Sequence, residues 1–140
     1  MTDSKEQPPS QLPLNIMENK YGVEVILDLH MCNPAKFNRE SIERYFIELC
    51  ERIDMKRADL HFWDDLGLPD EERETEPHLK GTSAIQFIST SNITIHTLDI
   101  LKNAYVNIFS CKNFDPQVVK EFSERWFEGK AVTYQVLDRK

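Results

Sequence analysis

The sequence is short of the features that mark several whole classes of protein. Its 140 residues include only three cysteines, and no run approaches the roughly 18 apolar residues of a membrane span. Three cysteines, Cys32, Cys50 and Cys111, are an odd and sparse set, so we expect no disulfide framework and a reducing compartment. The N-terminus also lacks the basic-then-apolar order of a signal peptide. We therefore expect a cytoplasmic protein with no membrane partner.

Positive charge is scarce as well. Lys and Arg number 17 against 24 Asp and Glu, which gives a formal net charge of −7 at pH 7. Binding to nucleic acid requires a surplus of Lys and Arg to neutralise phosphates, so we do not expect nucleic acid as a partner. With 40% hydrophobic and 29% charged residues, the composition is typical of a globular domain, and the length favours a single domain with a substantial core.

The motifs of several common active sites are missing. The histidines and cysteines have no CxxC, HxxxH or HExxH spacing, so we expect no metal site. The four glycines are too scattered for a phosphate-binding loop, and no GxSxG nucleophile elbow occurs. Any chemistry must therefore come from a less common arrangement.

The apolar pattern predicts an α+β domain. Residues 1–20 contain three prolines and no periodicity, which predicts a flexible arm ahead of a single domain at residues 21–140. Apolar and polar residues alternate from Tyr21 to Leu29, as in a strand with one buried face. Apolar residues three or four apart predict helices that begin at the capping residues Asn38 and Asp115, the second of which ends at Gly129.

Further strands are predicted at residues 60–63, 84–88, 92–96, 105–109 and 131–137. The order strand, helix, strands, helix, strand predicts a two-layer sandwich in which two amphipathic helices cover one face of a mostly antiparallel sheet. The other face would meet solvent or a partner, and its apolar content favours a homodimer.

Residues 64–80 differ from the rest of the chain in charge. Seven acids are opposed by two bases, a local excess of five negative charges. Together with its glycine and two prolines, this composition predicts a long loop inserted in the domain. Such a loop either has a function or is a solvated segment that aids solubility, and charge alone does not decide between the two.

One polar strand segment is the remaining place for chemistry. Asn92, Thr94 and His96 alternate with two isoleucines, which places His96 on a polar face. Cys111 ends the next predicted strand, and a short turn would bring it near His96, so that Ser91, His96 and Cys111 converge. The structural alternative is a hydrogen-bonded strand histidine and a cysteine that acts as a small buried hydrophobe.

A family resemblance favours the catalytic interpretation. The segment Ser89-Thr-Ser-Asn-Ile-Thr-Ile-His-Thr97, preceded by Gly81-Thr-Ser-Ala and followed by Asn107-Ile-Phe-Ser-Cys111, resembles the core of the prokaryotic S-adenosylmethionine decarboxylases. The family pattern is Ser-Glu-Ser-His, then aliphatic-Thr-aliphatic-His-Thr, then a strand that ends in aromatic-polar-Cys. The separations from serine to histidine and from histidine to cysteine match without a gap, and the resemblance is clear over about residues 81–115.

The resemblance implies a self-processing, pyruvoyl-dependent decarboxylase that acts on S-adenosylmethionine for polyamine (spermidine) synthesis. Ser91 would attack the carbonyl of Thr90, the chain would break between these two residues, and Ser91 would become the pyruvoyl group that forms a Schiff base with the substrate. His96 would transfer a proton in self-processing, and Cys111 would be the proton donor in catalysis. Neither a metal nor pyridoxal phosphate would take part.

The sequence departs from the family at two positions beside the break. Thr90 stands where the family usually has Glu, and Asn92 where it usually has His. The residue before the break supplies only a carbonyl, but a β-branched side chain alters the backbone strain that the acyl shift requires. Asn92 removes a titratable group next to the pyruvoyl.

The substrate is less well defined than the chemistry. Phe62 or Trp63 would stack on adenine or face a sulfonium cation, unless they are core residues, and Asp64 and Asp65 would pair with a cationic end of the substrate. These carboxylates suit ornithine or arginine at least as well as S-adenosylmethionine. A second hypothesis is therefore a pyruvoyl-dependent decarboxylase of a basic amino acid. A third is an unprocessed homologue that serves as a binding or regulatory subunit.

Overall fold

The structure, a computed structural model, describes residues 20–140, so the arm predicted at residues 1–20 lies almost entirely outside the described residues. The described elements follow the predicted order. They are β1 (Gly22–His30), η2 (Pro34–Lys36), α2 (Arg39–Arg52), β2 (Arg57–Trp63), η3 (Asp70–Glu72), β3 (Gly81–Ile88), β4 (Ser91–Leu98), β5 (Asn103–Ser110), α3 (Pro116–Phe127) and β6 (Lys130–Arg139). The first and last predicted strands and both helices are confirmed to within a few residues, and β2 is longer than predicted.

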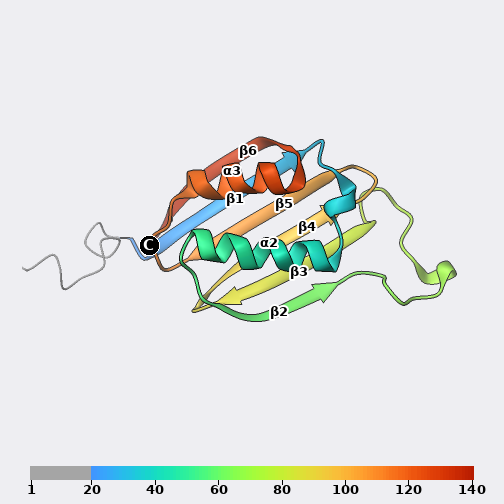
Figure 1. The fold of residues 1–140 in the computed structure, drawn as a ribbon, viewed down its shortest axis with the longest axis horizontal. Helices are drawn as coiled ribbons and strands as arrows, with labels where there is room; N and C mark the ends of the chain where they lie inside the picture. Colours follow the sequence, from blue (N-terminus) through green and yellow to red (C-terminus); the bar gives the residue numbers. More distant parts are fainter. Residues whose placement is uncertain (1–19) are drawn as a thin grey trace, which may run out of the picture.

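The strands form one open, six-stranded sheet in the order β2-β3-β4-β5-β1-β6. Every pair of neighbouring strands among residues 20–140 is antiparallel. The strands β3, β4 and β5 form a meander in the middle of the sheet, and the two helices lie on one face, with α3 over β1 and β6 and α2 over the other half (Figure 1). The predicted two-layer α+β sandwich is therefore confirmed.

Both helices begin where their capping residues predict. The side chain of Asn38 accepts a hydrogen bond from the Ser41 N–H at the start of α2, and that of Asp115 accepts one from the Gln117 N–H at the start of α3. These bonds satisfy N–H groups that have no partner inside the helix. Helix α3 ends at Phe127, two residues before the predicted Gly129, because Glu128 adopts the left-handed conformation that closes the helix.

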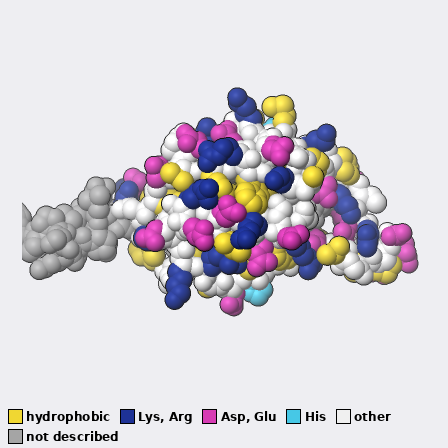
Figure 2. Space-filling model, in the orientation of Figure 1, with side chains coloured by type: hydrophobic (Ala, Val, Ile, Leu, Met, Phe, Trp, Pro, Cys, Tyr) yellow, Lys and Arg dark blue, Asp and Glu magenta, His cyan; other side chains and the backbone are white. Residues whose placement is uncertain are grey.

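The core lies between the helices and the sheet. Tyr45 of α2 is fully buried, stacks on Phe122 of α3, and shares a hydrogen bond of 2.6 Å with Ser123. Alternate residues of the central strands meet this layer, for example Val25, Leu27, Ile93, Ile95 and Ile108. The helix-side surface carries Lys and Arg interspersed with Asp and Glu, with only small apolar patches between them (Figure 2).

No helix of the described residues covers the opposite face of the sheet. Large apolar side chains point to this open face from neighbouring strands: Trp63 of β2 is 66% exposed, and Ile85 and Phe87 of β3 are 38% and 42% exposed. Such a row of exposed apolar groups is unusual on a monomer and is typical of a surface that meets another protein. We refer to this surface, which also carries His96, as the open face.

Candidate active site

A two-residue turn joins the central strands β3 and β4. Ile88 pairs with Ser91, so Ser89 and Thr90 alone form the connection, and both are exposed. The backbone of Thr90 has φ of +47°, a left-handed conformation that β-branched residues rarely adopt. The bond that the family resemblance marks for cleavage therefore lies at the accessible tip of a strained hairpin.

Ser91 and Cys111 meet beside this turn. Since β4 pairs with β5 in antiparallel register, the residue that follows β5 comes next to the start of β4. The Cys111 N–H donates to Ser91 Oγ at 3.1 Å, and Ser91 Oγ donates to Cys111 Sγ at 3.7 Å. Thr90 Oγ1 also lies 3.4 Å from Cys111 Sγ. The structure thus brings together two of the three residues that the sequence analysis expected to converge.

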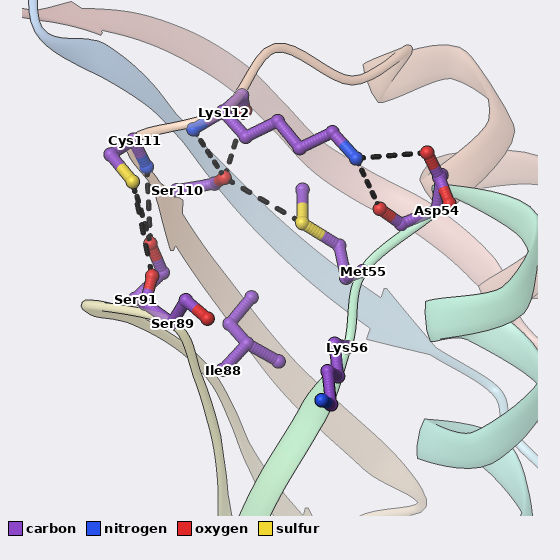
Figure 3. A pocket seen from close by; sticks show the side chains of 9 residues that line it. All are labelled: Asp54, Met55, Lys56, Ile88, Ser89, Ser91, Ser110, Cys111 and Lys112. Atoms are coloured by element: carbon purple, nitrogen blue, oxygen red, sulfur yellow. Dashed lines mark hydrogen bonds and ion pairs between the residues drawn. The ribbon is translucent and has the colours of Figure 1, made fainter.

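These residues line a cavity of about 390 Å³ at the end of the sheet (Figure 3). Its walls come from the segment that follows α2, from the tip of the β3–β4 hairpin and from the end of β5; they are Asp54, Met55, Lys56, Ile88, Ser89, Ser91, Ser110, Cys111 and Lys112. Lys112 Nζ lies 2.9 Å from the Asp54 carboxylate, and Ser110 Oγ donates to the Lys112 carbonyl at 2.8 Å. The cavity is large enough for part of a small substrate.

The Cys111 thiol is more acidic than an ordinary cysteine. Its pKa is lowered chiefly by the hydrogen bond with Thr90, and further by those with Ser91 and Tyr21, while partial burial opposes the shift. Burial instead raises the pKa of Cys32 and Cys50 to about 11. Among the three cysteines, Cys111 is therefore the one whose surroundings favour the thiolate, and a thiol with a lowered pKa suits proton transfer.

His96 lies elsewhere. It is five residues beyond Ser91 on β4, which corresponds to roughly 17 Å along the strand. Five is an odd number, so the two side chains point to opposite faces: Ser91 to the helix side and His96 to the open face. The expectation that Ser91, His96 and Cys111 converge is wrong within one chain.

The nearest partner of His96 is a serine that the sequence analysis did not assign. Its Nδ1 lies 2.7 Å from the Ser83 Oγ, because Ser83 faces His96 across the β3–β4 pairing. Both residues line a second cavity of about 280 Å³ with Trp63 and His78. The register of the two-residue turn was the signal for this pair, since it sets residue 83 opposite residue 96.

The four residues predicted to bind substrate lie far from Ser91 along the strands. Phe62 packs against the core with the Arg39 guanidinium 5.6 Å from its ring centre, and Trp63 is exposed on the open face. None of the four lines the cavity around Ser91 and Cys111.

Asp64 and Asp65 already have cationic partners within the chain. Asp64 accepts two hydrogen bonds from Arg39, at 2.7 and 2.8 Å, which lower the pKa of its carboxyl. Asp65 accepts one from Lys80 at 2.8 Å and one from the Glu74 N–H, and these lower its pKa. Asp64 thus fastens the start of the loop at residues 64–80 to α2, and Asp65 ties the two ends of this loop together.

Two further features bear on the class of protein. Within residues 20–140, no group of three or more His, Cys, Asp and Glu side chains is arranged to hold a metal ion. No helix in that part of the chain is long and apolar enough to cross a membrane.

Comparisons with known proteins identify the family. A family model described as S-adenosylmethionine decarboxylase matches residues 23–140. The S-adenosylmethionine decarboxylase proenzyme of Hydrogenobaculum sp. (strain Y04AAS1) is 27% identical over 96 residues, which cover 68% of this chain and 63% of that relative, less than two thirds of its length. The crystal structure of the adenosylmethionine decarboxylase from Aquifex aeolicus has the same fold, with a TM-score of 0.67 at 18% identity over 86% of this chain and 91% of the other. Because the family model spans nearly the whole described domain, the chain belongs to the S-adenosylmethionine decarboxylase family.

Proposed function

We propose that the protein is a self-processing, pyruvoyl-dependent decarboxylase of S-adenosylmethionine, whose product is the aminopropyl donor for spermidine synthesis. The observation that carries the proposal is the contact between Ser91 Oγ and Cys111 at the tip of an exposed hairpin, beside a cavity. The family membership supports the class of reaction, and the contact between Ser91 and Cys111 supports the choice of catalytic residues.

The residues at the turn suit self-processing. Ser91 Oγ adds to the Thr90 carbonyl carbon; a C–O bond forms and the C–N bond between the two residues breaks, which leaves an ester. Removal of the Cα proton of residue 91 and departure of the Thr90 carboxylate break the Cα–H and Cβ–O bonds and leave a dehydroalanine. The dehydroalanine tautomerises to an imine, and water hydrolyses the imine to the pyruvoyl group and ammonia. The Cys111 N–H orients Ser91 Oγ, and the left-handed Thr90 holds the carbonyl in a strained turn from which cleavage releases it.

The pyruvoyl group would supply the electron sink that an amino acid requires in order to lose CO2. This chain's contribution is then a proton for the substrate carbon. The Cys111 thiol lies beside residue 91 in the cavity, and a thiol is a suitable acid for proton transfer near neutral pH. Metal ions and pyridoxal phosphate have no part in the proposal.

The position of His96 supports a homodimer. If His96 transfers a proton during self-processing, it must reach Ser91 of another chain, because it is out of reach of Ser91 in its own. The open face on which His96 and Ser83 lie also exposes the apolar side chains that a second copy would bury. We therefore propose that the open faces of two copies pack together and that His96 of each copy acts at the exposed Ser89-Thr90 turn of the other, which carries the carbonyl that Ser91 attacks.

The ion pairs of Asp64 and Asp65 favour S-adenosylmethionine over a basic amino acid as the substrate. The case for ornithine or arginine depended on Asp64 and Asp65 as partners for a cationic side chain. Both carboxylates are bound by Arg39 and Lys80 and are remote from Ser91. A basic substrate would have to displace these ion pairs, whereas a sulfonium substrate requires no such exchange.

Release of labelled CO2 tests the proposed function. We expect purified protein to release it from carboxyl-labelled S-adenosylmethionine and not from ornithine or arginine, and to contain two polypeptides, residues 1–90 and 91–140, in denaturing mass spectrometry. Release of CO2 from ornithine or arginine alone would establish the hypothesis of a basic amino acid decarboxylase. An intact chain that releases no CO2 from any of the three would establish a non-catalytic homologue.

Replacing Cys111 with alanine separates processing from turnover. We expect the Cys111→Ala chain to be cut, since Ser91 and the Thr90 carbonyl are unchanged, and decarboxylation to fall by about a hundredfold or more because the proton donor is lost. Mass spectrometry and CO2 release measure the two effects on one preparation. Cys32→Ala, which removes a buried thiol beside Lys102 at the opposite end of the sheet, is the control for loss of a sulfhydryl. Normal turnover in Cys111→Ala would remove Cys111 from the mechanism.

A further inference from the structure

Thr90 makes more contacts than its place before the cleaved bond requires. Its hydroxyl lies 2.8 Å from the Ser89 carbonyl, to which it donates, and 3.4 Å from Cys111 Sγ. Thr90 makes both contacts from a left-handed backbone conformation. A β-branched residue is costly in this conformation, where Gly or Asn is usual, so the side chain is expected to have a role that offsets the cost.

The hydroxyl has one hydrogen and two neighbours that accept hydrogen bonds, which gives it two arrangements. With Cys111 protonated, the thiol donates to Thr90 Oγ1 while the threonine hydroxyl donates to the Ser89 carbonyl. With Cys111 ionised, the hydroxyl turns and donates to the thiolate. The second arrangement stabilises the anion, since a hydrogen bond to an ionised group is stronger than one between neutral groups.

The other groups around Cys111 do not replace this contact. Ser91 Oγ lies 3.7 Å from Sγ, and Tyr21 at the start of β1 also bonds the cysteine. The nearest cation in sequence, Lys112, is paired with the Asp54 carboxylate, which offsets its field at the sulfur, and Lys56 lines the far wall of the cavity (Figure 3). The hydrogen bond with Thr90 is the largest cause of the lowered pKa of Cys111, ahead of those with Ser91 and Tyr21.

We propose that Thr90 is a positioning residue for Cys111: its hydroxyl exchanges hydrogen bonds with the sulfur and so makes the thiol easier to ionise. The family usually has Glu here, whose carboxylate would have the opposite effect on a neighbouring thiolate. The proposal describes the uncut chain, in which Thr90 is held beside the sulfur, and it is independent of the proposed function. After the cleavage that the proposed function requires, Thr90 would be a chain end.

Alkylation of Cys111 tests the proposal in chains that cannot be cut. Three full-length chains carry Ser91→Ala, so each keeps the bond between residues 90 and 91, and they have Thr90, Thr90→Ser or Thr90→Val. The rate of iodoacetamide labelling is measured from pH 6 to pH 10, with the label assigned to Cys111 by mass spectrometry. Cys32 and Cys50 are buried and of raised pKa, so their lack of label shows that the fold is intact.

We expect the Thr90→Val chain to be labelled at least about threefold more slowly than the Thr90 chain at pH 7.5, and at the same rate once the pH exceeds the pKa of Cys111 in both. Valine keeps the β-branched shape and removes only the hydroxyl. Thr90→Ser keeps the hydroxyl and is expected to follow the Thr90 profile. If valine unfolds the hairpin, as labelling of Cys32 or Cys50 would reveal, Thr90→Ala takes its place.

Three outcomes would overturn the proposal. Identical profiles for Thr90 and Thr90→Val would show that the hydroxyl leaves the thiol unaffected. A labelling rate that changes by the same factor at every pH would show that Thr90 alters the access of iodoacetamide to the sulfur and not the ionisation of the thiol. A Thr90→Ser chain that behaves like Thr90→Val would show that a hydroxyl at position 90 is not what lowers the pKa of the thiol. Because all three chains stay uncut, these results do not depend on whether the Ser91 chain processes itself, which the mass of that chain reports separately.

Discussion

Replacing Ser91 with alanine is expected to leave one intact chain of 16.5 kDa with no decarboxylase activity. The oxygen that attacks the Thr90 carbonyl is the only part of Ser91 that the substitution removes, and without it neither the ester nor the pyruvoyl group can form. The loss of turnover should therefore be complete. Denaturing mass spectrometry and labelled-CO2 release from S-adenosylmethionine measure the two effects.

The neighbouring serine provides a matched control. Ser89 lies two residues away at the same exposed turn, and only its main-chain carbonyl contacts Thr90 and Cys111. Ser89→Ala should therefore be cut as the unaltered chain is; because Ser89 also lines the cavity, it is the control for cleavage and not for the rate of turnover. Hydroxylamine, which reacts with ketones, should modify active protein and the Ser89→Ala chain but not Ser91→Ala. Cleavage of Ser91→Ala between residues 90 and 91 would disprove the assignment of the nucleophile.

Local patterns were sufficient to predict the fold because each element carries its own signal. The alternation from Tyr21 to Leu29 reflects a strand with one face on the helices, and the caps at Asn38 and Asp115 mark helix starts through bonds made within a few residues. The order of the strands was not predictable in this way. The position of β1 between β5 and β6 depends on contacts between residues 75 or more positions apart, such as Leu29 with Ala104 and Ile26 with Gln135.

The site was predicted less completely, for a related reason. Ser91 and Cys111 meet because β4 and β5 are adjacent hairpin partners, which a short turn implies. Asp54 and Lys112, which close the cavity, come from segments 58 residues apart and have no local signal. The sequence already implied that His96 and Ser91 point to opposite faces of the strand, because they are an odd number of residues apart. The family resemblance pointed to one catalytic cluster and did not say whether that cluster spans two chains.

Two inactive chains mixed together are expected to restore cleavage if His96 acts between copies. Alone, a Ser91→Ala chain cannot be cut, and a His96→Ala chain should be processed about a hundredfold or more slowly because it lacks the proton-transfer group. In a mixed dimer, the His96→Ala chain keeps its own Ser91 and receives His96 from the Ser91→Ala chain. With equal expression about half of the His96→Ala chains should pair in this way and be cut, while no Ser91→Ala chain is.

Cleavage in mixed dimers distinguishes a His96 that acts on the partner chain from one that acts within its own chain. Tags of different mass on the two chains identify which one is cut after co-expression. Thr94→Ala is the control, since Thr94 lies two residues from His96 on the same strand and face and should be cut without a helper. A His96→Ala chain that stays intact in mixed dimers would require His96 to act within its own chain, which the roughly 17 Å along β4 and the opposite directions of the two side chains oppose. Rapid cleavage of His96→Ala alone would leave His96 and Ser83 with a structural role on the open face.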